Sequence, residues 1–262
     1  MFSVFRRLLT VALVAVALIG LPAAGRPALA IANGEDAADG AYPFAVLLTM
    51  TGLPAERGGT RDSSCSGALV APRWVITAGH CFRTFDGTRV EYPVADLTTA
   101  TVGRTDLTGS GGHEIKVVAV RQSPTADVAL AKLETPITDI KPIRIGREAP
   151  AVGAVVRLTG YGSTTSVSPA PVTRLRTGQM TVVSLGDSVT GMRGYAPQPD
   201  TTPCPYDSGA PFFLEKRTAR PILVAVVSNG PSCPHTEVES AARTDNIAGW
   251  IFTAIGRRTA GW

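Results

Sequence analysis

The strongest constraint on the fold is a series of short runs rich in Val, Ile, Leu and Thr, separated by Gly, Pro, Ser and Asp. Many short strands at such spacing indicate an antiparallel β-sandwich or β-barrel. The runs lie at 44–50, 67–71, 74–78, 115–121, 128–133, 154–162, 178–184, 210–215 and 221–228. Between them, 56–64, 109–112 and 162–172 are expected to be loops, and 148–154 a junction between two β halves.

Only the C-terminal segment has convincing helical periodicity. Its apolar residues recur at helical spacing and form one stripe, which predicts a helix docked on the core. They are Ile247, Trp250, Ile251, Ala254 and Ile255. Thr244 or Asp245 is a candidate N-cap and Gly256 a candidate stop, which places the helix at about 244–257.

The first thirty residues are typical of a secretory signal peptide. Arg6 and Arg7 precede an apolar run at 8–21, and Ala28-Leu29-Ala30 has the A-x-A pattern of a cleavage site. The alternative is a membrane anchor, which needs roughly 20 apolar residues, and this run has 14. We therefore expect a secreted, extracellular protein that has no membrane attachment after cleavage.

Charge and cysteine content limit the partners. Removal of 1–30 takes away three arginines and no acidic residue, so the net charge falls from +4 to +1. The sequence has no basic tract with interleaved aromatics, which argues against a nucleic acid partner.

Four cysteines in an exported chain predict two disulfides, for which three pairings are possible. The absence of CxxC spacing argues against structural zinc. We predict no metal and no cofactor.

One of the three histidines is a candidate catalytic base. His113 and His235 lie in polar, flexible segments and are expected to be solvated surface residues. His80 instead follows the apolar run 74–78 and precedes Cys81. A disulfide at Cys81 would hold the imidazole in one place.

Two further side chains complete a candidate triad. Ser208, in CPYDSGAP, resembles a nucleophile set in a tight turn, and a serine hydroxyl needs a base within hydrogen-bond reach. Asp127 opens the apolar run 128–133, which would draw it inside the protein. A buried carboxylate needs a partner, and an imidazole base needs a carboxylate to orient it, so we expect Asp127 to pair with His80.

These residues lie in segments that resemble the trypsin/chymotrypsin-like serine proteases, in the family's order. The segments are SCSGALVAPRWVITAGHC (64–81), DVAL (127–130), TGYG (159–162), CPYDSGAP (204–211) and SNGPSC (228–233). The His, Asp, Ser order distinguishes this family from subtilisin-like and α/β-hydrolase arrangements. The likeness extends from Ile31 to the C-terminal helix.

The resemblance implies an all-β fold of two six-stranded antiparallel β-barrels with the active site between them, followed by a C-terminal helix. It places one protease domain at 31–262, with barrel one at about 31–147 and barrel two at about 148–243. It also pairs Cys65 with Cys81 and Cys204 with Cys233.

The resemblance also implies a role for each catalytic residue. Ser208 would be the nucleophile, His80 the general base and then the general acid, and Asp127 the orienting carboxylate. Ser228 corresponds to a family serine close to that aspartate. The backbone N–H groups of Tyr206 and Ser208 would form the oxyanion hole.

The start of the mature chain fits the same family. In IANG (31–34), a freed α-amino group on Ile31 would pair with Asp207 and shape the oxyanion hole. Because the A-x-A site adjoins Ile31, we expect signal cleavage itself to produce the active form. Cleavage after Gly25 is the alternative and would leave the propeptide RPALA.

Tyr206 departs from the family, which has glycine two residues before the nucleophile. A backbone donor survives any side chain except proline. If the glycine's dihedral angles are ones that a Cβ disfavours, the peptide would flip and withdraw its N–H. Losing one such donor typically costs about 10²–10³ in turnover.

The substrate pocket departs as well. Thr202 stands at the pocket base where trypsin has an aspartate, and Asn229 replaces a tryptophan that lines the cleft. Gly230 leaves the pocket mouth open. Glu239 falls near a small wall glycine. If it points inward it would restore a preference for basic substrates or fill the pocket, and the alternative is a solvated surface glutamate.

The leading hypothesis is a secreted, monomeric serine endopeptidase that cleaves protein or peptide substrates through an acyl-enzyme on Ser208. The alternative is a weakly active or inactive homologue that works by binding. The intact His80, Asp127 and Ser208 favour the enzyme, whereas Tyr206 and Asn229 favour the binding protein. An esterase that uses the same residues is a third reading.

Overall fold

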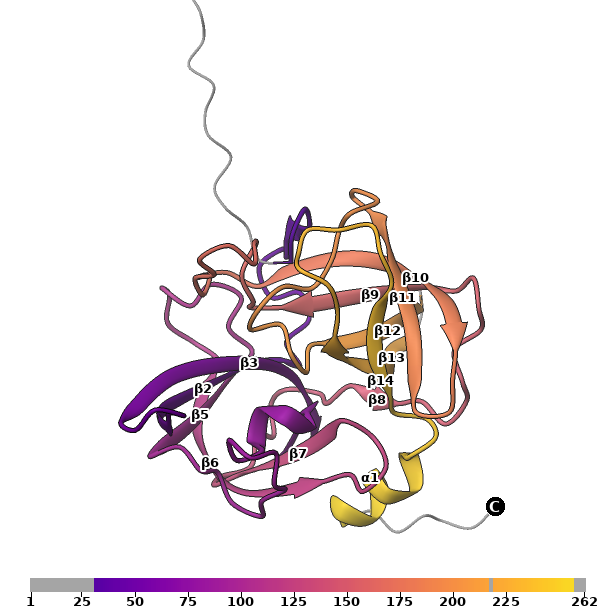
Figure 1. The fold of residues 1–262 in the computed structure, drawn as a ribbon. Coiled ribbons are helices and arrows are strands. Elements are labelled where there is room, and N and C mark those ends of the chain that lie inside the picture. The colour runs from indigo at the N-terminus through magenta and orange to yellow at the C-terminus, as the bar shows by residue number, and fades with distance from the viewer. Residues whose placement is uncertain (1–30, 217–218, 257–262) are drawn as a thin grey trace, which may run out of the picture.

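The computed structural model describes residues 31–216 and 219–256. Its strands form two six-stranded antiparallel β-barrels, and one helix follows them at the C-terminal end of the described residues (Figure 1). This confirms the predicted fold class. The predicted signal peptide, 1–30, and the end of the predicted helix, residue 257, lie outside the described residues.

The first barrel closes in the strand order β2-β3-β4-β7-β6-β5. Its strands are β2 (Ala45–Pro54), β3 (Thr60–Ala71), β4 (Trp74–Ala78), β5 (Leu97–Val102), β6 (His113–Gln122) and β7 (Val128–Leu133). A 3₁₀ helix, η1 (Gly79–Phe82), follows β4 directly. The core holds small and branched side chains such as Val46, Leu48, Ile76 and Leu130, all buried.

The second barrel forms a ring in the order β9-β10-β11-β14-β13-β12, which pairing of β12 with β9 closes. Its strands are β9 (Val155–Gly160), β10 (Arg176–Leu185), β11 (Val189–Ala196), β12 (Pro211–Lys216), β13 (Ala219–Asn229) and β14 (Glu239–Arg243). Two short strands extend this sheet: β1 (Glu35–Asp36) pairs with β10, and β8 (Arg144–Ile145) runs parallel to β13. The chain segments at 35–36 and 144–145 thus join the second barrel's sheet.

Each of the nine apolar runs overlaps a strand, but β5, β11 and β14 lack such a run. They contain Thr, Gly, Arg, Ser and Ala, and they form because strands on both sides supply hydrogen-bond partners. The prediction of a loop at 56–64 is wrong for 60–64, which belongs to β3. Exposed polar side chains there hid a strand whose backbone pairs with the end of β2.

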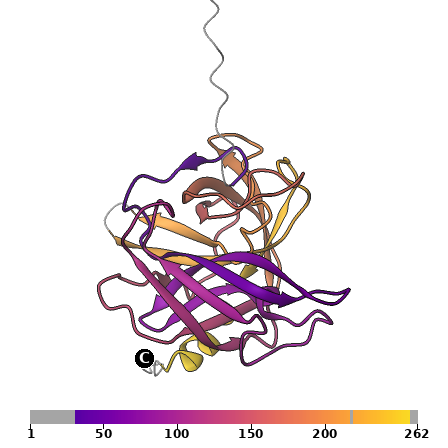
Figure 2. The same cartoon turned by 90° about the vertical axis from the view of Figure 1, so that its left-hand side faces the viewer.

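The helix α1 (Ala248–Ala254) docks on the core, as predicted. Ile247 and Ile251 are buried in the same cluster as the first barrel's core, and Figures 1 and 2 show the helix beneath that barrel. The predicted cap is wrong, because Ile247 holds the N-cap position and makes no side-chain cap bond. Asp245 is engaged instead with Arg243, at 2.6 Å between Oδ2 and Nη2.

Candidate active site

The pairing of β4 with β7 brings His80 and Asp127 together. Ala78 lies opposite Val128 in this antiparallel pair, so the residues just beyond them meet at the same edge of the barrel. His80 follows β4 in η1, and Asp127 directly precedes β7. His80 and Asp127 are 47 positions apart in the sequence, and the pairing of these two strands brings them together.

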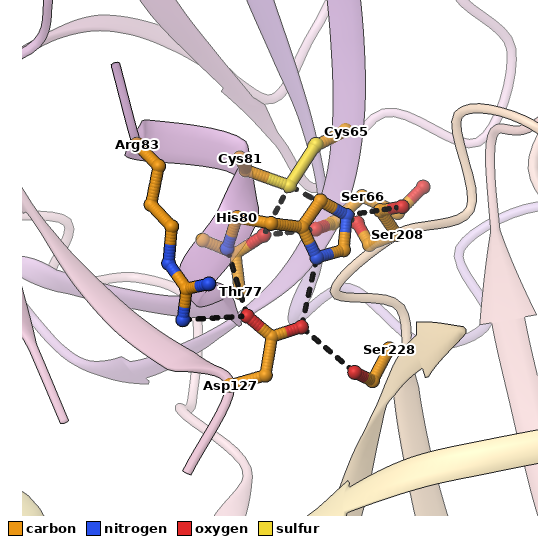
Figure 3. A network of polar contacts seen from close by, with 9 residues as sticks. All are labelled: Cys65, Ser66, Thr77, His80, Cys81, Arg83, Asp127, Ser208 and Ser228. Carbon is orange, nitrogen blue, oxygen red and sulfur yellow. Dashed lines mark hydrogen bonds and ion pairs between the residues drawn. A yellow bond between two sulfur atoms is a disulfide. The ribbon is translucent and has the colours of Figure 1, made fainter. Parts of the chain in front are cut away.

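Asp127, His80 and Ser208 form an unbroken chain of hydrogen bonds (Figure 3). His80 Nδ1 lies 2.8 Å from Asp127 Oδ2, and His80 Nε2 lies 2.8 Å from Ser208 Oγ. A carboxylate can only accept, so Nδ1 carries the ring proton and Nε2 is free to accept from the serine hydroxyl. The His80 backbone N–H also donates to Asp127 Oδ1 at 2.9 Å.

Asp127 is held ionised by its neighbours. Ser228 Oγ donates to Oδ2 at 2.7 Å, and Arg83 Nη2 lies 3.6 Å from Oδ1. Burial raises the pKa of Asp127, but hydrogen bonds from His80 and Ser228 outweigh burial, and the net pKa lies below its usual value. The carboxylate can therefore stabilise a charged imidazolium.

Ser208 reaches His80 because its turn lies tightly against the first barrel. Gly209, with a φ of 82°, packs so closely on β4 that an added Cβ would lie within 2.5 Å of the Ala78 nitrogen. The Ser66 N–H donates to the Ser208 carbonyl at 2.9 Å. A larger residue than glycine would push the nucleophile away from the base.

The two disulfides join Cys65 to Cys81 and Cys204 to Cys233, the pairing that the resemblance implies. The first ties η1, which carries His80, to β3. The second ties the turn before Ser208 to the segment after β13. Both covalent links thus act on segments of the candidate site.

Tyr206 adopts the backbone conformation that favours glycine. Its φ is 75°, in the left-handed region. Its carbonyl accepts from Ser66 Oγ at 3.1 Å. Among the described residues, no acceptor is found for the N–H of Tyr206 or of Ser208. The turn thus leaves both predicted oxyanion donors unpaired.

Asp207 is fully buried beneath the same turn. It accepts from the N–H of Gly162 at 2.8 Å and of Cys204 at 3.0 Å, and the backbone of buried Ile31 also donates to it. Burial, only partly offset by these hydrogen bonds, raises the pKa of Asp207 to about 7. The structure thus brings together Ile31 and Asp207, which the sequence predicts as partners.

A cavity of about 370 Å³ adjoins Ser208. Four of the predicted pocket residues line it, namely Ser228, Asn229, Gly230 and Glu239. Thr202 is fully buried and is not among the described residues that line this cavity. A second groove, of about 810 Å³, runs from His80 past the exposed Phe85.

The prediction for His235 is wrong. Its side chain is only 7% exposed, and Nε2 lies 2.7 Å from Oε1 of Glu239, whose side chain is 4% exposed. The alternative of a solvated surface glutamate is therefore also wrong. The sequence did carry a signal, because His235 lies two residues after Cys233 and four before Glu239. His113 instead contacts the exposed Asp139, at 2.8 Å from Nε2 to Oδ1.

Within 31–216 and 219–256, no group of three or more His, Cys, Asp or Glu side chains is placed to hold a metal ion. In the same described residues, no helix has the length and apolar character needed to cross a membrane.

The sequence was compared with protein families and with curated proteins, and the matches are serine proteases. The family model described as Trypsin matches residues 31–251. A trypsin-like protease of Streptomyces glaucescens is 28% identical over 87% of this chain and 83% of its own length. The serine proteinase stubble of Drosophila melanogaster is 25% identical over 90% of this chain, but the match spans only 32% of that longer protein. A human chymotrypsin-like elastase, family member 3B, is 40% identical over 33% of this chain and 32% of its own length.

Proposed function

The chain belongs to the trypsin family of serine proteases, and on that premise we propose that it is a secreted endopeptidase that cleaves protein or peptide substrates through an acyl-enzyme on Ser208. The observation that carries the proposal is the continuous hydrogen-bond chain from Asp127 through His80 to Ser208. Its two 2.8 Å contacts have the length needed for proton transfer.

In the first half of the reaction, Ser208 Oγ attacks the substrate carbonyl carbon and gives its proton to His80 Nε2. The imidazolium is stabilised by Asp127 and then donates that proton to the leaving amine as the peptide bond breaks. In the second half, His80 removes a proton from water, which attacks the acyl-enzyme and releases the acid.

The oxyanion of each tetrahedral intermediate would be stabilised by the N–H groups of Tyr206 and Ser208. The turn supports this role, because Tyr206 takes the left-handed conformation that favours glycine, and among the described residues neither N–H has an acceptor. Donors that are fixed before reaction lower the barrier without reorganising.

A fluorophosphonate probe tests the nucleophile. We expect one equivalent of label on the mature protein and none on the Ser208→Ala variant. Ser110→Ala is the control, because Ser110 is an exposed serine in the loop between β5 and β6, outside the candidate site. A folded wild-type protein that takes up no label would contradict the proposal.

A second candidate, a weakly active homologue that acts by binding, is favoured by exposed Asn229 at the cavity and by the strain that a non-glycine residue bears at Tyr206. It predicts substrate binding with labelling slower by about 10²–10³, the cost of one lost oxyanion donor. Tyr206→Gly would then restore the rate.

We extend the proposal to processing. Cleavage after Ala30 would turn the Ile31 backbone nitrogen, already a donor to Asp207, into an ammonium group beside a buried carboxylate. N-terminal sequencing of the secreted, monomeric protein is expected to begin at Ile31. A chain that begins at Arg26 would contradict direct activation by signal cleavage.

A further inference from the structure

The cavity beside Ser208 has a carboxyl group in its wall. Glu239, the first residue of β14, lines it together with Gly230. A Cβ added to Gly230 would overlap both carboxyl oxygens of Glu239. The Glu239 carboxyl group therefore occupies the space that any side chain at position 230 would need, which only glycine permits, and about 370 Å³ remains open beside it.

His235 fixes the orientation of this glutamate. The N–H of Glu237 donates to His235 Nδ1 at 3.1 Å, so that nitrogen is an acceptor and the ring proton lies on Nε2. Nε2 then donates to Glu239 Oε1 at 2.7 Å. Among the described residues, Oε2 has no hydrogen-bond partner. The hydrogen bond from His235 thus fixes Oε1 of Glu239 and leaves Oε2 free to bind a ligand.

Among the described residues that line the cavity there is no Lys, Arg or His, and Glu239 is the one acidic residue. Asp207 faces Glu239 from the turn before the nucleophile, and Glu237 lies on the adjoining loop. Met192 and Asn229, next to this end of β14 on the neighbouring strands, are uncharged. Burial, together with the negative charge of Asp207, raises the pKa of Glu239 to about 8. The acidic groups around the cavity thus favour the binding of a cationic group beside Glu239.

We propose that Glu239 is the specificity-determining residue of this cavity and selects substrates with Lys or Arg on the acyl side of the cleaved bond. The inference rests on the proposed endopeptidase function. An ammonium or guanidinium group would supply the partner that Oε2 lacks and would stabilise the ionised carboxylate. A neutral side chain would leave that oxygen unpaired, and an acidic one would be repelled.

A binding experiment tests the cavity without catalysis. Ser208→Ala protein is titrated calorimetrically with benzamidinium and with its neutral analogue benzamide. We expect benzamidinium to bind about 10- to 100-fold more weakly when Glu239→Gln is added, the usual range for a hydrogen bond to a charged group. Glu237→Gln removes an equal charge from an exposed residue outside the cavity lining and is expected to leave binding unchanged.

A kinetic experiment separates this inference from the proposed function. Peptides that differ only in the residue before the cleaved bond, namely Lys, Arg, Gln, Phe or Glu, are compared on wild-type and Glu239→Gln enzyme, and fluorophosphonate labelling counts active sites. We expect Glu239→Gln to lower kcat/KM for Lys and Arg about 10- to 100-fold and to label normally.

Normal labelling with no preference for cations would overturn the inference and leave the proposed function intact. Absent labelling together with benzamidinium binding that depends on Glu239 would overturn the proposed function and leave the cavity assignment intact. If wild-type protein binds neither probe and cleaves only after small residues, Glu239 fills the cavity, and the inference is wrong.

Discussion

Replacing Glu239 with Gln should stabilise the protein, by an amount that depends on pH. The variants are made in the Ser208→Ala background to prevent self-cleavage. Gln has nearly the same shape, and its carbonyl oxygen accepts the same hydrogen bond from His235. The substitution therefore removes one ionisable group and little else.

The pKa of Glu239 sets the magnitude. Burial raises it from 4.5 to about 8 in the folded protein. The unfolded chain releases this proton near pH 4.5 and the folded chain holds it to about pH 8, so stability falls as pH rises between these values and is flat above. At about 1.36 kcal/mol per pKa unit, the cost is about 3 kcal/mol at pH 7 and about 4 kcal/mol at pH 8.

Urea unfolding followed by tryptophan fluorescence at pH 5, 6, 7, 8 and 9 measures this cost. The difference between Glu239→Gln and its parent should be under about 1 kcal/mol at pH 5 and should grow to about 3 kcal/mol at pH 7. Asp207 remains in both proteins, so its own titration largely cancels. Parallel loss of stability in the two proteins across this range would refute the reasoning, as would an equal effect of Glu237→Gln.

Three further changes test the catalytic scaffold. Asp127→Asn should lower kcat by about 10⁴, the loss known for this change in the trypsin-type triad, because the amide favours the His80 tautomer with its proton on Nε2; a steady-state assay with near-normal kcat would contradict this. Cys65→Ala with Cys81→Ala should cost about 3 kcal/mol of unfolding free energy, as expected for a loop of 16 residues, and should reduce activity through mobility of His80. Gly209→Ala should lower the melting temperature and abolish fluorophosphonate labelling, because the added Cβ would overlap β4; a variant that labels at the wild-type rate would show that the close packing is not needed.

Most of the strands could be predicted from the sequence, because each strongly apolar run must bury its apolar face. The candidate triad could be predicted as well. The serine needs a base, the histidine needs an orienting carboxylate, and the buried aspartate needs a partner. Strands such as β5 and β14 could not be predicted, since their pairing partners, rather than their own side chains, make them strands.

The sequence alone determined the β class, the cysteine content and the three candidate catalytic side chains, because these follow from local pattern and chemical need. Only the tertiary structure decided that Tyr206 takes a left-handed conformation, that the His235 side chain is only 7% exposed, and that Glu239 lines the cavity beside Ser208. Those outcomes depend on which distant segments lie against each residue, and exposure and orientation are properties of that packing rather than of the residue type.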